Sequence, residues 1–245
     1  MKIYGLIGDS LGHSFSKKYF TEKFSNRNIK DCVYENFEIK DLQIEIPGLK
    51  SNPLIAGLNV TIPHKSKIFP FLDSISEVCN EINACNCIKI NDGKWIGFNT
   101  DVIGFKKTFI TNLQPYHKKA LILGTGGSSK AVAYCLKKLN IDFLFVSRKK
   151  NAAANIINYE SVSSLLLQQY SIVINTTPVG MFPNLDSYPQ LPYENISDKH
   201  YFFDLIYNPS ETWFLAKAKA RGAIVKNGNE MLSIQAEESW KIWNS

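Results

Sequence analysis

The sequence has 245 residues, of which 44% are hydrophobic and 20% are charged. These proportions are typical of a globular protein and exclude a disordered or fibrous chain, and the length allows one or two domains. The formal net charge of +6 comes from lysines scattered along the chain, which argues against a nucleic-acid partner. No apolar run approaches the length that spans a membrane, and no signal peptide precedes the first predicted strand. We therefore expect a cytoplasmic protein that binds small molecules.

The five cysteines bear on the compartment and on metal binding. An odd number without the spacing of a disulfide framework fits a reducing cytoplasm. Cys79, Cys85 and Cys87 lie close together, but no second pair of cysteines or histidines stands at zinc-finger spacing. We expect these three to be buried apolar side chains and predict no metal site.

In chain order, the first hundred residues predict short strands and one amphipathic helix. The strands are expected at 3–8, 33–38 and 55–60, and the helix at 17–26. Pro63 forbids simple continuation of the third strand, so the polar residues around it lie on a loop at a strand end.

A hairpin follows, in which residues 88–90 pair with 95–98 around an Asp-Gly turn. Thr100 and Asp101 then resemble the cap of a helix at 102–109.

The second half of the chain alternates strands and helices. The strands are expected at 120–123, 143–146, 171–175, 201–206 and 222–225, and the helices at 131–136, 164–170, 212–220 and 231–243. This alternation predicts a mostly parallel sheet with its ligand at the carboxyl ends of the strands. Joints rich in glycine and asparagine, near Gly104 and Gly228, bound the region. We predict an α/β fold of two domains with a cleft between them, one of residues 1–101 and 228–245 and a Rossmann-like one of residues 102–227.

A glycine turn between two apolar strands predicts a dinucleotide site. Gly124 permits the tight turn, and Gly126 lets the backbone approach a pyrophosphate at the N-terminus of the next helix. The third small position of the glycine pattern falls on Ser129. The alternative is a tight turn that binds nothing. The candidate cofactor residues here are Gly124, Thr125, Gly126, Gly127 and Ser128.

The end of the following strand indicates which dinucleotide is bound. An NAD site places Asp or Glu there to hold the ribose hydroxyls, whereas this chain has Ser147, Arg148 and Lys149. The guanidinium of Arg148 can bind a 2′-phosphate bidentately with lysine support. A solvated basic turn is the alternative. We predict NADP, in its reduced form NADPH, with these three residues as contacts.

An enzyme that reduces a ketone with a nicotinamide also needs a proton donor for the oxygen. Lys65 follows a proline turn at a strand end, which is where ligands gather in α/β folds. Taken alone, one lysine is most simply a solvated surface residue, and Asp101 is most simply a helix N-cap. The residues by themselves predict an NADP-binding α/β enzyme and no more.

Taken together, the motifs at the strand ends resemble those of the shikimate dehydrogenase family, in family order and over nearly the whole chain. Residues 59–65 match N-V-T-x-P-x-K, and residues 97–104 match G-x-N-T-D-x-x-G. Residues 12–16 and 83–87 match the family more loosely. Further similar segments are 124–131, 175–181, 204–209 and 228–236.

The resemblance implies reversible, NADP-dependent interconversion of 3-dehydroshikimate and shikimate, a step of chorismate and aromatic amino-acid biosynthesis. Lys65 would then donate the proton, and Asp101 would pair with Lys65 and hold a substrate hydroxyl. Residues 1–101 and 228–245 would bind the substrate. The carboxylate contacts would be Ser14, Ser16 and Tyr207, the ring-hydroxyl contacts Thr61, Asn86, Gln235 and Asn59, and the nicotinamide contacts Leu205 and Gly228.

Two other functions stay open. A paralogue on the same scaffold would also accept quinate, and discrimination would then lie near Ser14, Ser16 and Tyr207. A non-catalytic NADP-binding regulator is disfavoured because such a protein has no use for an acid–base pair. The strictness of NADP over NAD rests on Arg148 and its neighbouring lysines, since the segment after Lys150 is short. We expect a monomer or a homodimer.

Overall fold

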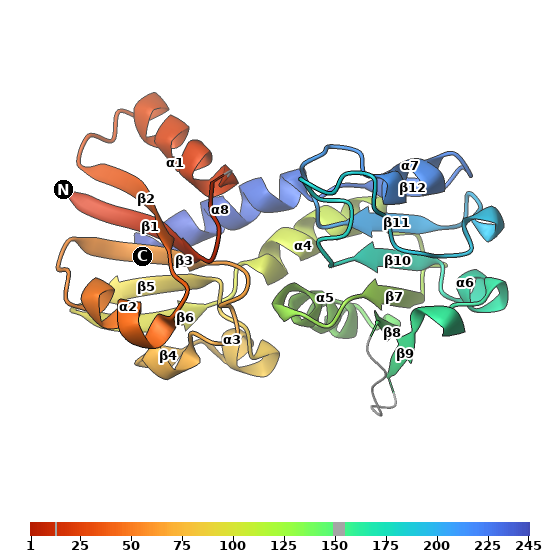
Figure 1. Cartoon of the computed structure of the whole chain (residues 1–245), viewed down its shortest axis with the longest axis horizontal. Coiled ribbons are helices and arrows are strands. Elements are labelled where there is room, and N and C mark those ends of the chain that lie inside the picture. The colour runs from red at the N-terminus through yellow and green to blue at the C-terminus, as the bar shows by residue number, and fades with distance from the viewer. Residues whose placement is uncertain (13, 149–154) are drawn as a thin grey trace. The chain divides into compact units, whose positions relative to one another are not determined.

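The computed structural model describes residues 1–12, 14–148 and 155–245, and the chain divides into two compact units (Figure 1). Unit 1 comprises Met1–Asp101 and Ser233–Ser245, and unit 2 comprises Val102–Leu232. Residues 228–232, which the sequence analysis places with the first domain, therefore belong to unit 2. Each unit has a six-stranded sheet of its own, and the predicted α/β class is confirmed.

The sheet of unit 1 is mixed, because the predicted hairpin interrupts its parallel strands. Its order is β2-β1-β3-β5-β6-β4. The strands are β1 (Lys2–Gly8), β2 (Cys32–Glu38), β3 (Ile55–Val60), β4 (Ser74–Ile75), β5 (Cys87–Asn91) and β6 (Lys94–Phe98). Strands β2, β1 and β3 run parallel, whereas β5 is antiparallel to both β3 and β6. Asp92 and Gly93 have φ values of 49° and 75°, as a tight hairpin turn requires.

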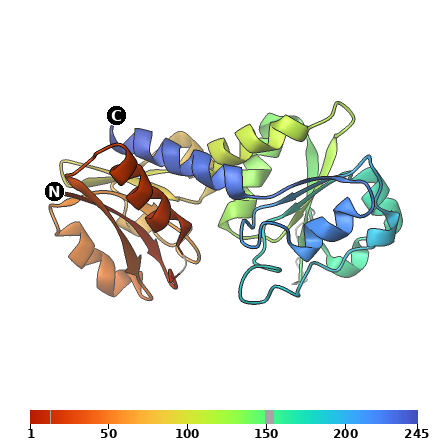
Figure 2. The same ribbon diagram turned by 90° about the horizontal axis from the view of Figure 1, so that it is seen from above.

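Helices cover both faces of this sheet. They are α1 (Phe15–Asn26), α2 (Leu42–Lys50), α3 (Glu77–Ile82) and most of α8 (Asn229–Trp243). Side chains alternate along β1, so Tyr4 packs with Phe20 of α1 and Trp243 of α8 on one face. Helices α1 (red) and α8 (blue) lie beside each other on that face (Figure 2). Ile7 packs with Ile46 of α2 on the other face.

The sequence analysis assigns no element to α2, β4 or α3. In α2 the helical pattern is interrupted by Pro47, yet its N-terminus is well capped. The carboxylate of Asp41 accepts a hydrogen bond from Gln43 N, and Glu45 accepts bonds from the backbone of Lys40 and Asp41. These bonds satisfy backbone donors that would otherwise lack partners, and so they support a helix that propensity alone disfavours.

The sheet of unit 2 is wholly parallel, in the order β12-β11-β10-β7-β8-β9. Its strands are β7 (Lys119–Leu123), β8 (Asp142–Ser147), β9 (Ile156–Asn158), β10 (Ile172–Asn175), β11 (Tyr201–Asp204) and β12 (Ile224–Lys226). Read from β9, this is the strand order of dinucleotide-binding folds, with the topological switch between β7 and β10. Ligands of such sheets bind beyond the carboxyl ends of the strands at that point.

Four helices pack on the sheet of unit 2: α4 (Asp101–Phe109), α5 (Gly127–Lys138), α6 (Ser164–Gln169) and α7 (Trp213–Lys219). Phe105 and Phe109 of α4 contact Phe203 on one face, and Phe214 of α7 contacts Phe202 on the other. Gly104, which the sequence analysis treats as a joint, lies inside α4. Short 3₁₀ helices lie at Phe69–Phe71, Ile110–Asn112, Tyr159–Ser161 and Tyr193–Asn195.

Two further properties concern the described parts of the chain. None of the helices in residues 1–12, 14–148 and 155–245 combines the length and the apolar character that crossing a membrane requires. Within the same residues, no group of three or more His, Cys, Asp or Glu side chains is placed to hold a metal ion.

Candidate active site

Lys65 and Asp101 form an ion pair in unit 1. Their Nζ and Oδ2 atoms lie 2.7 Å apart, and only 13% and 3% of the two side chains are exposed. Lys65 lies in the loop that follows β3, which is tightened by a hydrogen bond from His64 N to Thr61 O. Asp101 is the first residue of α4, where the helix dipole favours negative charge. Because water is largely excluded, the two charges interact more strongly than they would on the surface.

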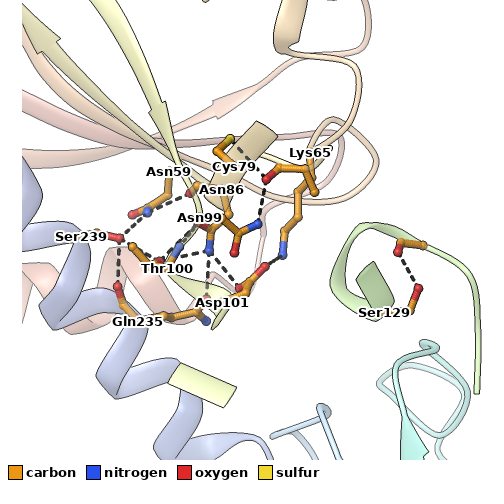
Figure 3. A network of polar contacts seen from close by, with 12 residues as sticks. Asn59, Lys65, Cys79, Asn86, Asn99, Thr100, Asp101, Ser129, Gln235 and Ser239 are labelled. Carbon is orange, nitrogen blue, oxygen red and sulfur yellow. Dashed lines mark hydrogen bonds and ion pairs between the residues drawn. The ribbon is translucent and has the colours of Figure 1, made fainter. Parts of the chain in front are cut away.

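Asn86 connects this ion pair to its surroundings (Figure 3). Its Oδ1 accepts a hydrogen bond of 2.7 Å from Thr100 N. Its Nδ2 donates to Asp101 Oδ1 at 2.9 Å and contacts Gln235 Oε1 at 3.3 Å. The neighbouring Cys85 N donates to Lys65 O at 2.7 Å, so the two segments are also joined through the backbone. Asn86 thus holds the carboxylate from the side opposite the lysine.

Asn59 lies at the end of β3 and extends the network toward α8. Its Nδ2 donates to Ser239 Oγ at 2.9 Å and contacts Asn86 O at 3.2 Å, while its Oδ1 accepts from Tyr34 at 2.9 Å. Ser239 lies one helical turn after Gln235 and donates to its carbonyl oxygen. Sequence reasoning missed Ser239 and Tyr34. The spacing of four residues from Gln235 is the one signal that could have indicated Ser239.

Three predicted substrate residues follow β1 and β3: Ser14 and Ser16 at the start of α1, and Thr61 in the loop after β3. Ser14 is the N-cap of α1, and its Oγ accepts a hydrogen bond from Lys17 N. Ser16 lies in the first turn of α1, near Tyr34, whose pKa is raised by burial. Thr61 N donates to Ile7 O, which ties the loop after β3 to the end of β1. Since β1 and β3 are parallel neighbours, the segments after them lie at the same edge of the sheet.

The structure therefore brings Lys65, Asp101, Asn86, Asn59 and Gln235 into one hydrogen-bonded network in unit 1. Ser16 lies beside this network, near Tyr34. Ser14 and Thr61 lie in the flanking loops, and their contacts with substrate stay predictions. Tyr207 belongs to unit 2, as do all the predicted cofactor residues.

The glycine turn of unit 2 has the geometry that a dinucleotide site needs. Gly124 has a φ of +102°, and a Cβ there would lie 2.9 Å from Thr176 Oγ1, so only glycine fits. A Cβ on Gly126 would meet no atom within 4 Å, which leaves open space in front of the backbone. Helix α5 begins at the next residue, Gly127. The N–H groups of its first turn, which includes Ser128, are those that a helix leaves for an anion.

The predicted contacts for the 2′-phosphate lie after the neighbouring strand. Ser147 ends β8, and Arg148 follows it with an exposed side chain. Gly124 N donates to Val146 O, so the end of β8 lies beside the glycine turn. Lys149 lies outside the described residues.

Leu205 and Gly228 pack against each other at the same end of the sheet. Gly228 N donates to Ile206 O at 3.0 Å, and a Cβ on Gly228 would lie 2.2 Å from Leu205 O. Strand β11 ends at Asp204, two residues earlier than predicted, so Leu205 already lies in the connecting loop.

Asp204 is a buried carboxylate for which the sequence analysis proposes no role. It accepts hydrogen bonds from Thr212, Ile206 N and Asn175. Burial raises its pKa to about 7, and these hydrogen bonds lower it only in part. Asp204 therefore ties the end of β10 to the N-terminus of α7.

Known proteins are similar to this chain in sequence over nearly its whole length. Residues 6–88 match the family model of the shikimate dehydrogenase substrate binding domain. The chain is 36% identical over 259 residues to the shikimate dehydrogenase (NADP(+)) of Caldicellulosiruptor saccharolyticus. The alignment covers 99% of this chain and 92% of that protein. The chain belongs to the shikimate dehydrogenase family.

Solved structures of family members share the whole fold. The crystal structure of shikimate dehydrogenase 1 from Peptoclostridium difficile is 36% identical and superimposes with a TM-score of 0.87, over 100% of this chain and 92% of that one. A shikimate dehydrogenase in complex with NADP+ is 34% identical, with a TM-score of 0.83 over 99% of this chain and 90% of that one. The predicted family is thereby confirmed.

Proposed function

We propose that this chain is an NADP-dependent shikimate dehydrogenase, which reversibly reduces 3-dehydroshikimate to shikimate with NADPH. This is a step in chorismate and aromatic amino-acid biosynthesis. The observation that carries the proposal is the shielded ion pair of Lys65 and Asp101, which is held in place by Asn86. A protein that only bound ligands would have no use for such a pair. The relatives that cover nearly the whole chain carry the same activity in their names.

In this proposal Lys65 is the proton donor. NADPH bound to unit 2 would supply the hydride for the carbonyl carbon. Lys65 Nζ gives its proton to the carbonyl oxygen, so that the ketone becomes a hydroxyl group. Asp101 orients the ammonium and accepts a hydrogen bond from a substrate hydroxyl. A proton transfer positioned in this way accelerates a reaction by typically about 10²–10⁴-fold.

The other polar residues of unit 1 would bind the substrate. Asn86, Asn59 and Gln235, together with Thr61, offer amide and hydroxyl groups to the ring hydroxyls. Ser14 and Ser16 would donate hydroxyl protons to the carboxylate, with Tyr207 assisting. Ser14 can do so while it caps α1, because its oxygen accepts the bond from Lys17 N and its proton stays available.

Unit 2 would hold the cofactor, and its residues fit one. The pyrophosphate would lie over Gly126 and the first turn of α5, where a Cβ finds open space. Arg148 would bind the 2′-phosphate with Ser147 and Lys149, and Leu205 and Gly228 would line the nicotinamide. We further propose a cytoplasmic monomer or homodimer. The five cysteines are free thiols, which suits a reducing compartment.

The test is steady-state oxidation of NADPH with 3-dehydroshikimate, followed by the loss of nicotinamide absorbance. We expect turnover by the unmodified protein and a loss of about 10²–10⁴-fold in kcat in Lys65→Ala. Lys67→Ala, at an exposed lysine of the same loop, is the control and should keep full activity. Absence of turnover by the unmodified protein would exclude the proposed function. Faster turnover of quinate would instead assign the chain to the quinate branch of the family.

A further inference from the structure

The side-chain amide of Asn59 is held at both of its ends. Tyr34 donates to Oδ1 at 2.9 Å, and Nδ2 donates to Ser239 Oγ at 2.9 Å. Both partners are buried, with 3% of Tyr34 and none of Ser239 exposed. Neither residue belongs to the motifs through which the sequence resembles the family. Each hydroxyl is buried and forms a hydrogen bond with Asn59, a candidate substrate contact, so each has a role that the motifs do not explain.

Ser239 connects three segments of unit 1 (Figure 3). Besides accepting from Asn59, its Oγ donates to Gln235 O at 2.9 Å and lies 3.4 Å from Thr100 Oγ1. It therefore fixes the turn of α8 that carries Gln235 against the end of β3 and against the segment before α4. Without this hydroxyl, Asn59 Nδ2 would keep only the weaker contact with Asn86 O.

Tyr34 performs the same task on the other side of Asn59. Its hydroxyl also lies near that of Ser16, a candidate carboxylate contact. Its ring is stacked on Phe20, with centroids 4.6 Å apart and planes inclined by 10°, so the hydroxyl has little freedom to move. Tyr34 thus fixes the amide of Asn59 from the side opposite Ser239.

We propose that Tyr34 and Ser239 are positioning residues, which set the orientation of Asn59 and Gln235 for substrate binding. The inference rests on the proposed function. Neither residue needs to touch the substrate, because each acts through the side chains or the backbone that it holds. Lys65 and Asp101 are bonded to each other, and Asn86, rather than Tyr34 or Ser239, holds the second oxygen of the carboxylate.

This separation predicts which kinetic constant changes. Side chains that bind the substrate equally in its ground state and its transition state affect KM and leave kcat unchanged. Loss of one hydrogen bond that positions such a group corresponds to an increase of about three- to tenfold in KM. We expect this increase for 3-dehydroshikimate and shikimate in both Ser239→Ala and Tyr34→Phe, with kcat changed by less than about twofold. The KM for NADPH should stay unchanged.

Each variant has a matched control in the chain. Thr108 of α4 also has a buried hydroxyl that donates one turn back along its helix, to Gly104 O, and Thr108→Val removes it. Tyr201 is a buried tyrosine that donates to Phe109 O, and Tyr201→Phe removes that bond. Both controls lie in unit 2, and both should keep the KM of the unmodified protein. Ser239→Thr retains the hydroxyl and should restore most of the affinity that Ser239→Ala loses.

The test measures steady-state kinetics and thermal unfolding of the unmodified protein and of the five variants. A raised KM in Ser239→Ala and Tyr34→Phe, absent from the controls and relieved in Ser239→Thr, supports the proposal. A lowered melting temperature with KM unchanged would show a merely structural role and overturn it. Turnover by the unmodified protein separates the two proposals. If the unmodified protein is inactive, the proposed function and this inference both fail, whereas an active protein with insensitive variants refutes this inference alone.

Discussion

Asp101 has both of its carboxylate oxygens occupied, Oδ2 by Lys65 Nζ at 2.7 Å and Oδ1 by Asn86 Nδ2 at 2.9 Å. A carboxylate that is held on both sides cannot rotate freely, so the ammonium of Lys65 is held in one place as well. The position matters for proton transfer, because a proton donor displaced by about 1 Å accelerates the reaction much less. The polar network around Asp101 therefore works as a support for Lys65.

Replacing Asp101 tests this support. Asp101→Asn removes the charge that orients Lys65 and should lower kcat by about 10²–10⁴-fold. It should also raise the KM for shikimate, because the proposed hydroxyl contact is weakened. Asp73→Asn is the control, since Asp73 pairs with Lys50 on the surface of the same unit. Steady-state kinetics of both variants would contradict the prediction if Asp101→Asn kept the kcat of the unmodified protein.

The two glycines of the cofactor turn should respond differently to alanine. Gly124→Ala forces a side chain into a left-handed backbone conformation and against Thr176, so it should lower the free energy of unfolding by about 1–3 kcal/mol. Gly126→Ala meets no atom of the protein and should leave stability within about 0.5 kcal/mol. Its methyl group would instead crowd the pyrophosphate, at a cost of about 1–3 kcal/mol in binding. Urea unfolding and NADPH titration measure the two effects, and equal stability of the two variants would contradict the account.

The charge of Arg148 should decide between the two cofactors. Arg148→Glu replaces a candidate phosphate ligand with a carboxylate that repels phosphate and can hold ribose hydroxyls. Loss of charged hydrogen bonds worth about 1.5–3 kcal/mol should raise the KM for NADPH by roughly ten- to a hundredfold. The KM for NADH should fall in the same variant. Lys137→Glu, at the far end of α5, changes the net charge equally and should leave both values unchanged. A similar response of the two variants would mean that Arg148 acts only through its general charge.

Much of the fold was predictable where the pattern is local. The apolar runs around the glycine turn predicted β7, α5 and β8, and Asp92-Gly93 predicted the hairpin. Helix α2 was missed because Pro47 interrupts the helical pattern, while its capping bonds become evident only when the backbone is placed. The sequence thus predicted the elements whose hydrophobic pattern is uninterrupted.

The sequence motifs predicted the central residues of the site, but they did not predict the residues that support them. Lys65 and Asp101 lie in two separate segments that each match the family. Tyr34 contacts Asn59 although β1 lies between their strands, so no periodicity within β2 indicates the contact. Such a contact depends on the packing of the whole sheet.

Asp204 predicts a pH dependence of stability. Its pKa is raised from the ordinary value of 3.8 to about 7 in the folded protein. Between these values the unfolded chain releases the proton while the folded one keeps it, so the contribution of Asp204 to the free energy of unfolding is largest below about pH 4 and is lost as the pH rises through about 7. Asp204→Asn stays neutral and should flatten this decline, by an amount on the order of a few kcal/mol. Urea unfolding at about pH 5 and about pH 8 measures it. Asp186→Asn, at an exposed carboxylate, should decline as the unmodified protein does.

Unit 1 is built from two segments of the chain, and its second segment carries Trp243, which packs against Gly57 of β3 and donates to Ile88 O. During synthesis, residues 102–232 leave the ribosome before that segment does. Unit 2 can therefore complete its fold while the face of β1 that carries Tyr4 still lacks helix α8. Domains fold as they emerge, and exposed apolar surface is prone to aggregate. Residues 233–245 close the unit that was begun first only after unit 2 has emerged, and until then the apolar face of β1 stays exposed.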